Sequence, residues 1–352
     1  MSLPCFQVGW RIFIFTAIAA LLFMLRLVTR SLCQHFLQTP LNNAVKLPRP
    51  LCFMAAPLLG LLLSGCALIK PASPDISLIE PISHPVRFLL TFDDGPSTSN
   101  SQNPTASILH DLEHNPIQPG IKALFFVQTR GATLRSPGRE LLPREHADGH
   151  LIGFHTATSG HKNHRFLSHE DFIASLENGI SDIQKVTGSA PKLVRPPFWN
   201  YDARTFDAYQ MHGMHVLLTD LSANDGKIWG FNGSPRRRIN LYNQLSTMRP
   251  KMVVGQIPVV DNVIPVVVTF HDTNPYTARH LHEYLQILLE VAAELNIPVS
   301  PQPFYQDKTA LERAALARTI KSESEVVVLP GIWSWIWGSN PDTGKAKLAA
   351  FN

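Results

Sequence analysis

Two adjacent carboxylates followed by a sharp turn are the first chemical signal in this sequence. Asp93 and Asp94 come directly after the apolar run 87–92, and Gly95-Pro96 then turns the chain. Successive side chains of an extended strand point in opposite directions, so one carboxylate can bind a metal while its neighbour polarises water. Taken alone the pattern is more typical of a surface turn, so chemistry is indicated only if further polar clusters accompany it.

A histidine-rich loop is the second cluster. His150, His155, His161 and His164 lie close together in a stretch that has few bulky apolar residues after position 155. Neutral imidazole is a common metal ligand, and two histidines with one carboxylate leave coordination positions open for water and substrate. The four cysteines all lie at or before Cys66, which excludes a thiolate-bound zinc in the rest of the chain.

The elements expected to position these clusters alternate along the chain from Val86 onward. The expected strands are 87–92, 121–127, 150–154, 192–194, 214–218, 266–270 and 297–299, and the expected helices are 168–187, 203–212 and 278–295. Such alternation predicts a parallel sheet or barrel, in which chemistry lies at the carboxyl ends of the strands. Polar clusters fall at five of these ends: Asp93-Asp94, His155, Arg195, Asp220 to Asp225, and His271-Asp272.

Four motifs in this order resemble the polysaccharide deacetylase (NodB-homology) family. They are Thr91 to Pro96, Gly149 to Thr156, Arg195 to Phe198, and Phe270 to Asp272. The resemblance implies an α/β fold, a distorted (β/α) barrel of about seven parallel strands in a single catalytic domain. It also implies a metal-dependent hydrolase that removes N-acetyl groups from N-acetylglucosamine-containing polysaccharide of the cell envelope or the extracellular space.

The resemblance further implies a role for each residue near the metal. Asp93 would be the general base, and Asp94 and His155 would bind a divalent metal, with Zn²⁺ the first expectation. In the family the second histidine ligand follows four positions after the first, but Ser159 occupies that position here. Counting back from the start of the next helix places this ligand at His161, in a longer loop, and leaves His164 as the alternative.

Two further residue pairs follow from the resemblance. Arg195 is expected to orient Asp93 through a charge-assisted hydrogen bond. His271 is expected to be the general acid for the departing amine, with Asp225 as its charge partner.

Three positions depart from the family pattern. Trp199 stands where glycine is frequent, Gly226 follows Asp225 in place of tryptophan, and Thr269 occupies a position that is usually aliphatic. The acetyl pocket and glycan groove are therefore expected to differ from those of better-known members.

The N-terminal region indicates a membrane-attached protein. Residues 1–44 are interpreted as a start placed too early or as a membrane helix, 45–65 as a signal segment, and 66–85 as a proline-rich tether. Leu63-Ser64-Gly65-Cys66 resembles a bacterial lipobox, which implies a lipid on Cys66. Ala67 after it implies a lipoprotein of the outer membrane that faces the periplasm.

The remaining boundaries place the catalytic domain at 86–306 and a C-terminal extension at 307–352. The extension is expected to hold a helix at 308–325, a strand at 326–329, and Trp333, Trp335 and Trp337, which either pack on the barrel or contact sugar or membrane.

The net charge of the chain limits the classes of partner that it can bind. A net charge of +4 spread along the chain argues against nucleic-acid binding. The resemblance implies an acetylated polysaccharide as the substrate and the N-terminal segment indicates a membrane as the second partner, and a monomer is expected. An O-acetyl esterase and a non-catalytic glycan-binding lipoprotein are the competing hypotheses.

Overall fold

The computed structural model describes residues 81–131, 136–225, 236–325, 327, 329 and 330. All of them belong to one compact unit, Leu78–Asn352. The predicted signal segment with Cys66, Gly226 and the three C-terminal tryptophans lie outside the described residues. Within the described part, the helices are too short or too polar to span a membrane.

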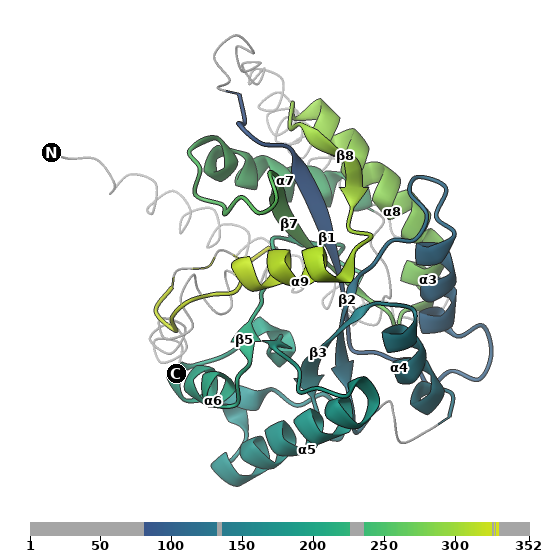
Figure 1. The fold of residues 1–352 in the computed structure, drawn as a ribbon, viewed down its shortest axis with the longest axis vertical. Coiled ribbons are helices and arrows are strands. Elements are labelled where there is room, and N and C mark those ends of the chain that lie inside the picture. Colours follow the sequence, from purple (N-terminus) through teal and green to yellow (C-terminus); the bar gives the residue numbers. More distant parts are fainter. Residues whose placement is uncertain (1–80, 132–135, 226–235, 326, 328, 331–352) are drawn as a thin grey trace, which may run out of the picture. The chain divides into compact units, whose positions relative to one another are not determined.

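A curled parallel sheet forms the centre of this unit (Figure 1). Seven strands follow the order β5-β4-β3-β2-β1-β7-β6, and β8 pairs with β1 beside this path. Their bounds are β1 Val86–Asp93, β2 Leu124–Gln128, β3 Leu151–Thr156, β4 Leu193–Val194, β5 His215–Val216, β6 Leu221–Ser222, β7 Ile264–His271 and β8 Val299–Phe304. Among the described strands no ladder joins β5 to β6, so the barrel is open there. The predicted distorted barrel of about seven parallel strands is confirmed.

Strand β1 pairs with three other strands of the sheet. It pairs with β7 along its whole length, from Val86 opposite Ile264 to Asp93 opposite His271. Its other edge is divided, because β8 pairs with its first residues and β2 with its last three. This register places the end of β1 and the end of β7 at the same level.

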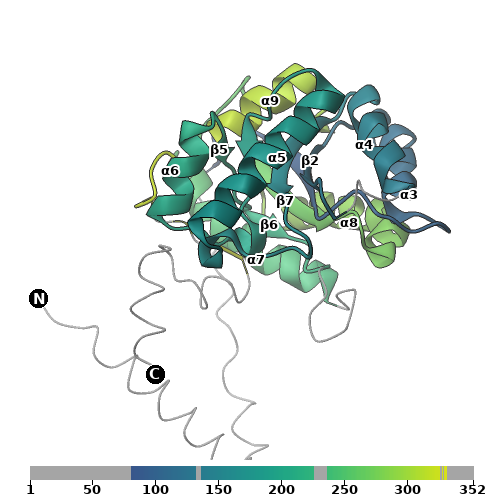
Figure 2. The same ribbon diagram turned by 90° about the horizontal axis from the view of Figure 1, so that it is seen from below.

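Helices surround the outer face of the sheet (Figures 1 and 2). They are α3 Pro104–Glu113, α4 Gly138–Ala147, α5 His169–Thr187, α6 Ala203–Met211, α7 Arg237–Val253 and α8 Pro275–Glu294. Local signals explain α5: the Ser168 hydroxyl accepts from the N–H of Asp171 at its start, and left-handed Gly188 ends it. The sequence predicted α5, α6 and α8 but did not predict α3, α4, α7 or β6.

The last described helix, α9 (Lys308–Ala317), lies on the inner side of the barrel. Its Leu311 packs with a second apolar cluster that includes Leu89 of β1, Phe126 of β2 and Val267 of β7. In Figure 1, α9 crosses in front of the strands. The predicted helix was too long, since α9 ends at Ala317 rather than at 325, and the described residues of the expected strand 326–329 are not in a strand.

Alternation along β1 and β7 separates an apolar layer from a polar one. Leu89 belongs to the inner cluster, and because side chains repeat every second residue, Thr91 and Asp93 face the same way. On β7 the same alternation places Val267, Thr269 and His271 on one face of the strand. The inner face is therefore apolar near α9 and polar toward the carboxyl ends of the strands.

Candidate active site

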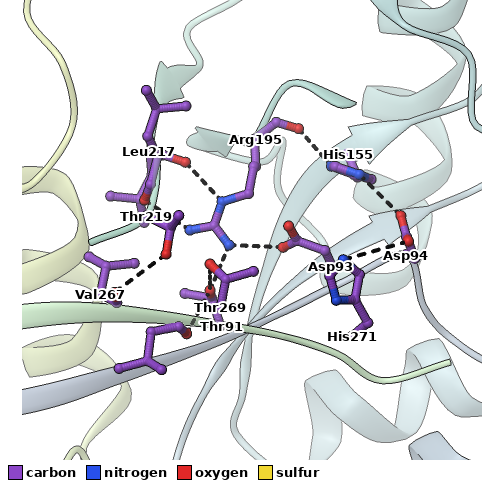
Figure 3. Close-up of polar contacts among 12 residues, drawn as sticks. Thr91, Asp93, Asp94, His155, Arg195, Leu217, Thr219, Val267, Thr269 and His271 are labelled. Atoms are coloured by element: carbon purple, nitrogen blue, oxygen red, sulfur yellow. Dashed lines mark hydrogen bonds and ion pairs between the residues drawn. The ribbon is translucent and has the colours of Figure 1, made fainter. Parts of the chain in front are cut away.

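Arg195 organises the polar layer from its position just after β4. Its side chain is fully buried, and Nη1 donates to Asp93 Oδ1 at 2.8 Å and to Thr91 Oγ1 at 2.6 Å. Nε donates to the backbone carbonyl of Leu217 at 3.0 Å (Figure 3). Nη2 donates to the backbone carbonyl of Leu218, also at 3.0 Å. These four hydrogen bonds, two to side chains and two to backbone carbonyls, fix the planar guanidinium, which in turn holds Asp93 in one orientation.

Thr269, the residue at the usually aliphatic position, is engaged in the same layer. It is fully buried, and its hydroxyl lies 3.1 Å from that of Thr91 (Figure 3). Thr91 in turn donates to the carbonyl of Val268 at 3.0 Å. Thr269 thus extends the hydrogen-bond network that supports Arg195.

Asp94, His155 and His161 converge next to Asp93. Oδ1 of Asp94 lies 3.2 Å from Nε2 of His155 and 3.3 Å from Nε2 of His161, and the two Nε2 atoms are 3.0 Å apart. Within the described residues, these three form a candidate metal site. His155 is buried, whereas the Asp94 and His161 side chains stay 24% and 26% exposed, so solvent reaches the cluster.

The tautomer of His155 follows from its second ring nitrogen. Nδ1 lies 2.7 Å from the carbonyl oxygen of Arg195, and because a carbonyl only accepts, Nδ1 carries the proton (Figure 3). In the neutral ring the lone pair of Nε2 then faces Asp94 and His161. Lone pairs that converge in this way fit a cation between them.

His164, the alternative third ligand, lies elsewhere. Its ring is fully buried, and its two nitrogens lie 2.9 Å from the hydroxyls of Tyr209 and Thr156. The structure therefore brings His161, rather than His164, to Asp94 and His155.

His271 and Asp225 form a second ion pair near the cluster. Nδ1 of His271 lies 2.8 Å from Asp225 Oδ1, and the Asp225 Oδ2 atom accepts from the backbone N–H of His271 at 2.9 Å. Thr277 also donates to Asp225, which is fully buried. The Nε2 atom of His271 faces Asp94, 4.0 Å from Oδ2, and 23% of this side chain is exposed.

These contacts set opposite charges on neighbouring groups. Burial alone would raise the pKa of Asp94, but the contact with His155 and the positive charge of the neighbouring imidazoles of His161 and His271, when they are protonated, hold that pKa well below its usual value. Burial lowers the pKa of His161 to about 4, against the pull of Asp94. Burial would also lower the pKa of His271, yet Asp225 and then Asp94 raise it to about 10. At neutral pH the site therefore holds a carboxylate, a neutral imidazole and an imidazolium.

Backbone strain gathers in the loops that carry the site. Asp94, His161 and Phe198 have φ of 76°, 50° and 61°, in the left-handed region that side chains seldom adopt. The expectation that Asp93 and Asp94 diverge because both are extended is therefore wrong for Asp94. A left-handed turn at Asp94, immediately after β1, separates the two carboxylates.

Two neighbours of Asp94 were given no role from the sequence. Gln128, at the end of β2, donates through Nε2 to Asp94 Oδ1 at 3.2 Å. Asp272 lies against Gly95 and accepts from Thr105 Oγ1 at 2.7 Å. The position of Asp272 beside His271 was the available signal for it, whereas nothing local distinguished Gln128.

Comparison with known proteins finds similarity to one family. The family model for polysaccharide deacetylase matches residues 84–217. A chitin deacetylase from Pestalotiopsis sp. is 28% identical over 178 residues, which are 49% of this chain and 56% of that protein. A peptidoglycan-N-acetylglucosamine deacetylase from Bacillus cereus is 33% identical over 208 residues, 58% of this chain and 66% of that protein. The chain thus spans between 56% and 66% of the length of these two curated relatives.

Among solved structures, the chitin deacetylase from Colletotrichum lindemuthianum is similar, with a TM-score of 0.45 and 23% sequence identity. The alignment covers 64% of this chain and 94% of that chain. The match of residues 84–217 to the family model and the similarity to curated deacetylases support the assignment of this chain to the polysaccharide deacetylase family.

Proposed function

We propose that this chain is a metal-dependent hydrolase that removes N-acetyl groups from a polysaccharide containing N-acetylglucosamine. The observation that carries the proposal is the convergence of three groups at one end of the barrel: the cluster of Asp94, His155 and His161, the Arg195–Asp93 pair, and the His271–Asp225 pair. The names of the curated relatives support the same reaction class.

The three clustered side chains fit a divalent metal. Two imidazole nitrogens and one carboxylate oxygen suit Zn²⁺, which we propose as the metal, and they leave positions open for water and substrate. Their spacing of 3.0 to 3.3 Å is close to the separation of about 3.3 Å expected for ligands about 2.0 Å from a tetrahedral ion. The chemistry that a divalent metal supplies when bound there is activation of water and polarisation of the amide carbonyl.

Proton transfer is assigned to residues on either side of this cluster. Asp93, oriented by Arg195, accepts a proton from the attacking water while the oxygen of that water bonds to the acetyl carbon. His271, charged through its contact with Asp225, donates a proton to the amide nitrogen as the carbon–nitrogen bond breaks. The products are acetate and a free amino sugar.

Acetate release by the purified full-length chain tests this proposal. The substrates are N-acetylglucosamine oligosaccharides, N-acetylated peptidoglycan and O-acetylated xylan, assayed before and after chelation and after Zn²⁺ is restored. We expect release from an N-acetyl substrate, loss on chelation, recovery with Zn²⁺, and a loss of at least 100-fold in Asp94→Asn. Asp207→Asn, which changes an exposed carboxylate on α6, is the matched control.

Two results would contradict the proposal. Release from the O-acetyl substrate alone would favour an esterase. A protein that binds no metal and whose behaviour toward glycans is the same in Asp94→Asn would favour a glycan-binding role.

We also propose, from the sequence, that lipidation of Cys66 anchors the protein in the outer membrane, facing the periplasm. The support is the segment Leu63-Ser64-Gly65-Cys66 with Ala67 after it. Labelling of cells with a palmitate analogue is expected to mark the wild-type protein and not Cys66→Ser. Equal labelling of both would contradict the anchor.

A further inference from the structure

A buried polar cluster lies behind the loop that carries His161. At its centre is His164, fully buried, with its ring between those of Phe154 and Phe172 at centroid separations of 5.9 Å and 5.3 Å. An apolar side chain would fill such a place without the cost of removing a polar ring from water. The polar partners of His164 therefore need an explanation.

Those partners form a chain of hydrogen bonds across the cluster. The Tyr209 hydroxyl lies 2.9 Å from Nδ1 of His164, and Nε2 lies 2.9 Å from Thr156 Oγ1. One assignment satisfies these atoms: Tyr209 donates to Nδ1, and the Nε2 proton is donated to Thr156. His164 is neutral in this arrangement, in agreement with burial, which lowers the pKa of His164 to about 3.

The chain continues into the loop itself. Thr156 Oγ1 accepts from the backbone N–H of Thr158 at 3.1 Å and lies 2.9 Å from the Thr158 hydroxyl. Thr158 Oγ1 accepts from the backbone N–H of Lys162 at 3.1 Å. These contacts connect the residue after His155 with the residue after His161.

Helix α6 holds the other end of the loop. Tyr209 belongs to α6, and so does Arg204, whose Nη2 donates to the carbonyls of His164 and Arg165 at 3.2 Å and 3.1 Å. The Arg204 guanidinium also lies over the Phe172 ring, 5.1 Å from its centroid. The loop is therefore fixed at Thr156 by β3 and at His164 by α6.

We propose that His164, with Thr156 and Tyr209, is a buried anchor that fixes the loop 157–163 and thereby sets the position and metal affinity of His161. This inference rests on the metal site of the proposed function. The loop contains Gly160, and His161 itself has a left-handed φ of 50°, a conformation that is costly for a residue other than glycine and needs contacts that hold it. Groups that orient a ligand from behind typically change metal affinity 10–100-fold when they are removed.

Zn²⁺ affinity of the full-length chain, measured by competition with a fluorescent chelator, tests the anchor. His164→Leu is expected to weaken binding about 10–100-fold. Tyr209→Phe, which removes only the hydroxyl, is expected to weaken it about threefold to tenfold. His164→Gln is expected to retain binding within about threefold, because its amide N–H replaces Nε2 toward Thr156.

Two controls make the comparison specific. Tyr305→Phe changes a buried tyrosine near α9 whose hydroxyl has no hydrogen-bond partner among the described residues, and is expected to leave affinity unchanged. His161→Gln removes a proposed ligand and is expected to abolish tight binding. If His164→Gln loses as much affinity as His161→Gln, His164 is a ligand and the anchor is wrong.

Hydrogen exchange of the metal-free protein provides a readout that does not depend on metal. Amides of 157–163 are expected to exchange faster in His164→Leu and Tyr209→Phe than in wild type or Tyr305→Phe. Unchanged exchange in folded variants would overturn the anchor. If wild type binds no Zn²⁺ while the exchange result holds, the proposed metal site fails and the loop anchor stands. Should His164→Leu not fold, Tyr209→Phe carries the test.

Discussion

Arg195 and Asp93 form an ion pair of 2.8 Å in which both side chains are almost completely excluded from water, at 0% and 4% exposed. The two residues are brought together by strands far apart in the sequence, since Asp93 ends β1 and Arg195 follows β4. A buried pair of this kind is strongly destabilised when one partner is removed, because the remaining charge stays in the protein interior.

Replacement of Arg195 by methionine is therefore expected to lower the free energy of unfolding by about 3–5 kcal/mol. Acetate release should fall at least about 100-fold, because Asp93 loses the group that orients it. Urea denaturation and the acetate assay measure the two effects. Arg238→Met is the matched control: Arg238 pairs with Glu290 and Glu294 at the surface, and its loss should cost under about 1 kcal/mol. Equal stability of the two variants would contradict the prediction.

The Asp225–His271 pair predicts a change in ionisation. Asp225→Asn keeps a hydrogen-bond acceptor near His271 but removes the negative charge. Burial, which lowers the pKa of His271, is then opposed less strongly. The pKa of His271 in the metal-free protein should fall from about 10, and kcat should fall by about 10²–10⁴-fold. Titration followed by NMR of the histidine rings, together with kcat, measures both. An unchanged His271 titration would show that Asp225 does not maintain its charge.

Gly95 predicts a steric effect on the turn that carries Asp94. A Cβ at position 95 would lie 1.9 Å from Oδ2 of Asp272, so Gly95→Ala forces one of the two to move. We expect a loss of about 1–3 kcal/mol in unfolding free energy and weaker Zn²⁺ binding. The double variant Gly95→Ala/Asp272→Ala removes the clashing atoms and should be more stable than the sum of the single effects. Additive losses would rule out the contact as the cause.

Glu145 predicts a pH-dependent stability. Its side chain is fully buried, and in the part of the chain that the structure describes its two carboxylate oxygens have no hydrogen-bond partner. Burial, with the charge of Asp272, raises the pKa of Glu145 well above 4.5. The folded protein then holds this proton more tightly than the unfolded chain. Stability contributed by protonated Glu145 is thus present at low pH and is lost as pH rises from about 4.5 toward the folded pKa.

Glu145→Gln removes that dependence. The stability of the variant relative to wild type should increase with pH, by up to about 1.4 kcal/mol for each pH unit in that range. Urea denaturation at pH 5 to 8 measures the slope. Glu140→Gln, an exposed change on the same helix, should leave the wild-type slope in place. A slope that is the same in Glu145→Gln and wild type would show that Glu145 does not titrate in this way.

Local sequence patterns predicted the helices whose ends carry capping residues. Ser168 and Gly188 begin and end α5, and Asp202 caps α6 by accepting from the N–H of Thr205. Helices α4 and α7 were not predicted because each contains an internal proline, Pro143 and Pro250, and neither has a clear apolar face in the sequence. Strand β6 has only two residues and, unlike β4 and β5, it lies in no apolar run, since Asp220 precedes it and Asn224 follows.

The sequence by itself determined which polar residues end the strands, and the parallel arrangement then requires those ends to meet. It could not decide between His161 and His164, because a loop histidine is defined by its neighbours in space. Tyr209, 45 residues further along the chain, lies beside His164, and the left-handed backbone at Asp94 and His161 turns those two side chains toward His155. Such contacts depend on packing between distant elements, which only the tertiary structure supplies.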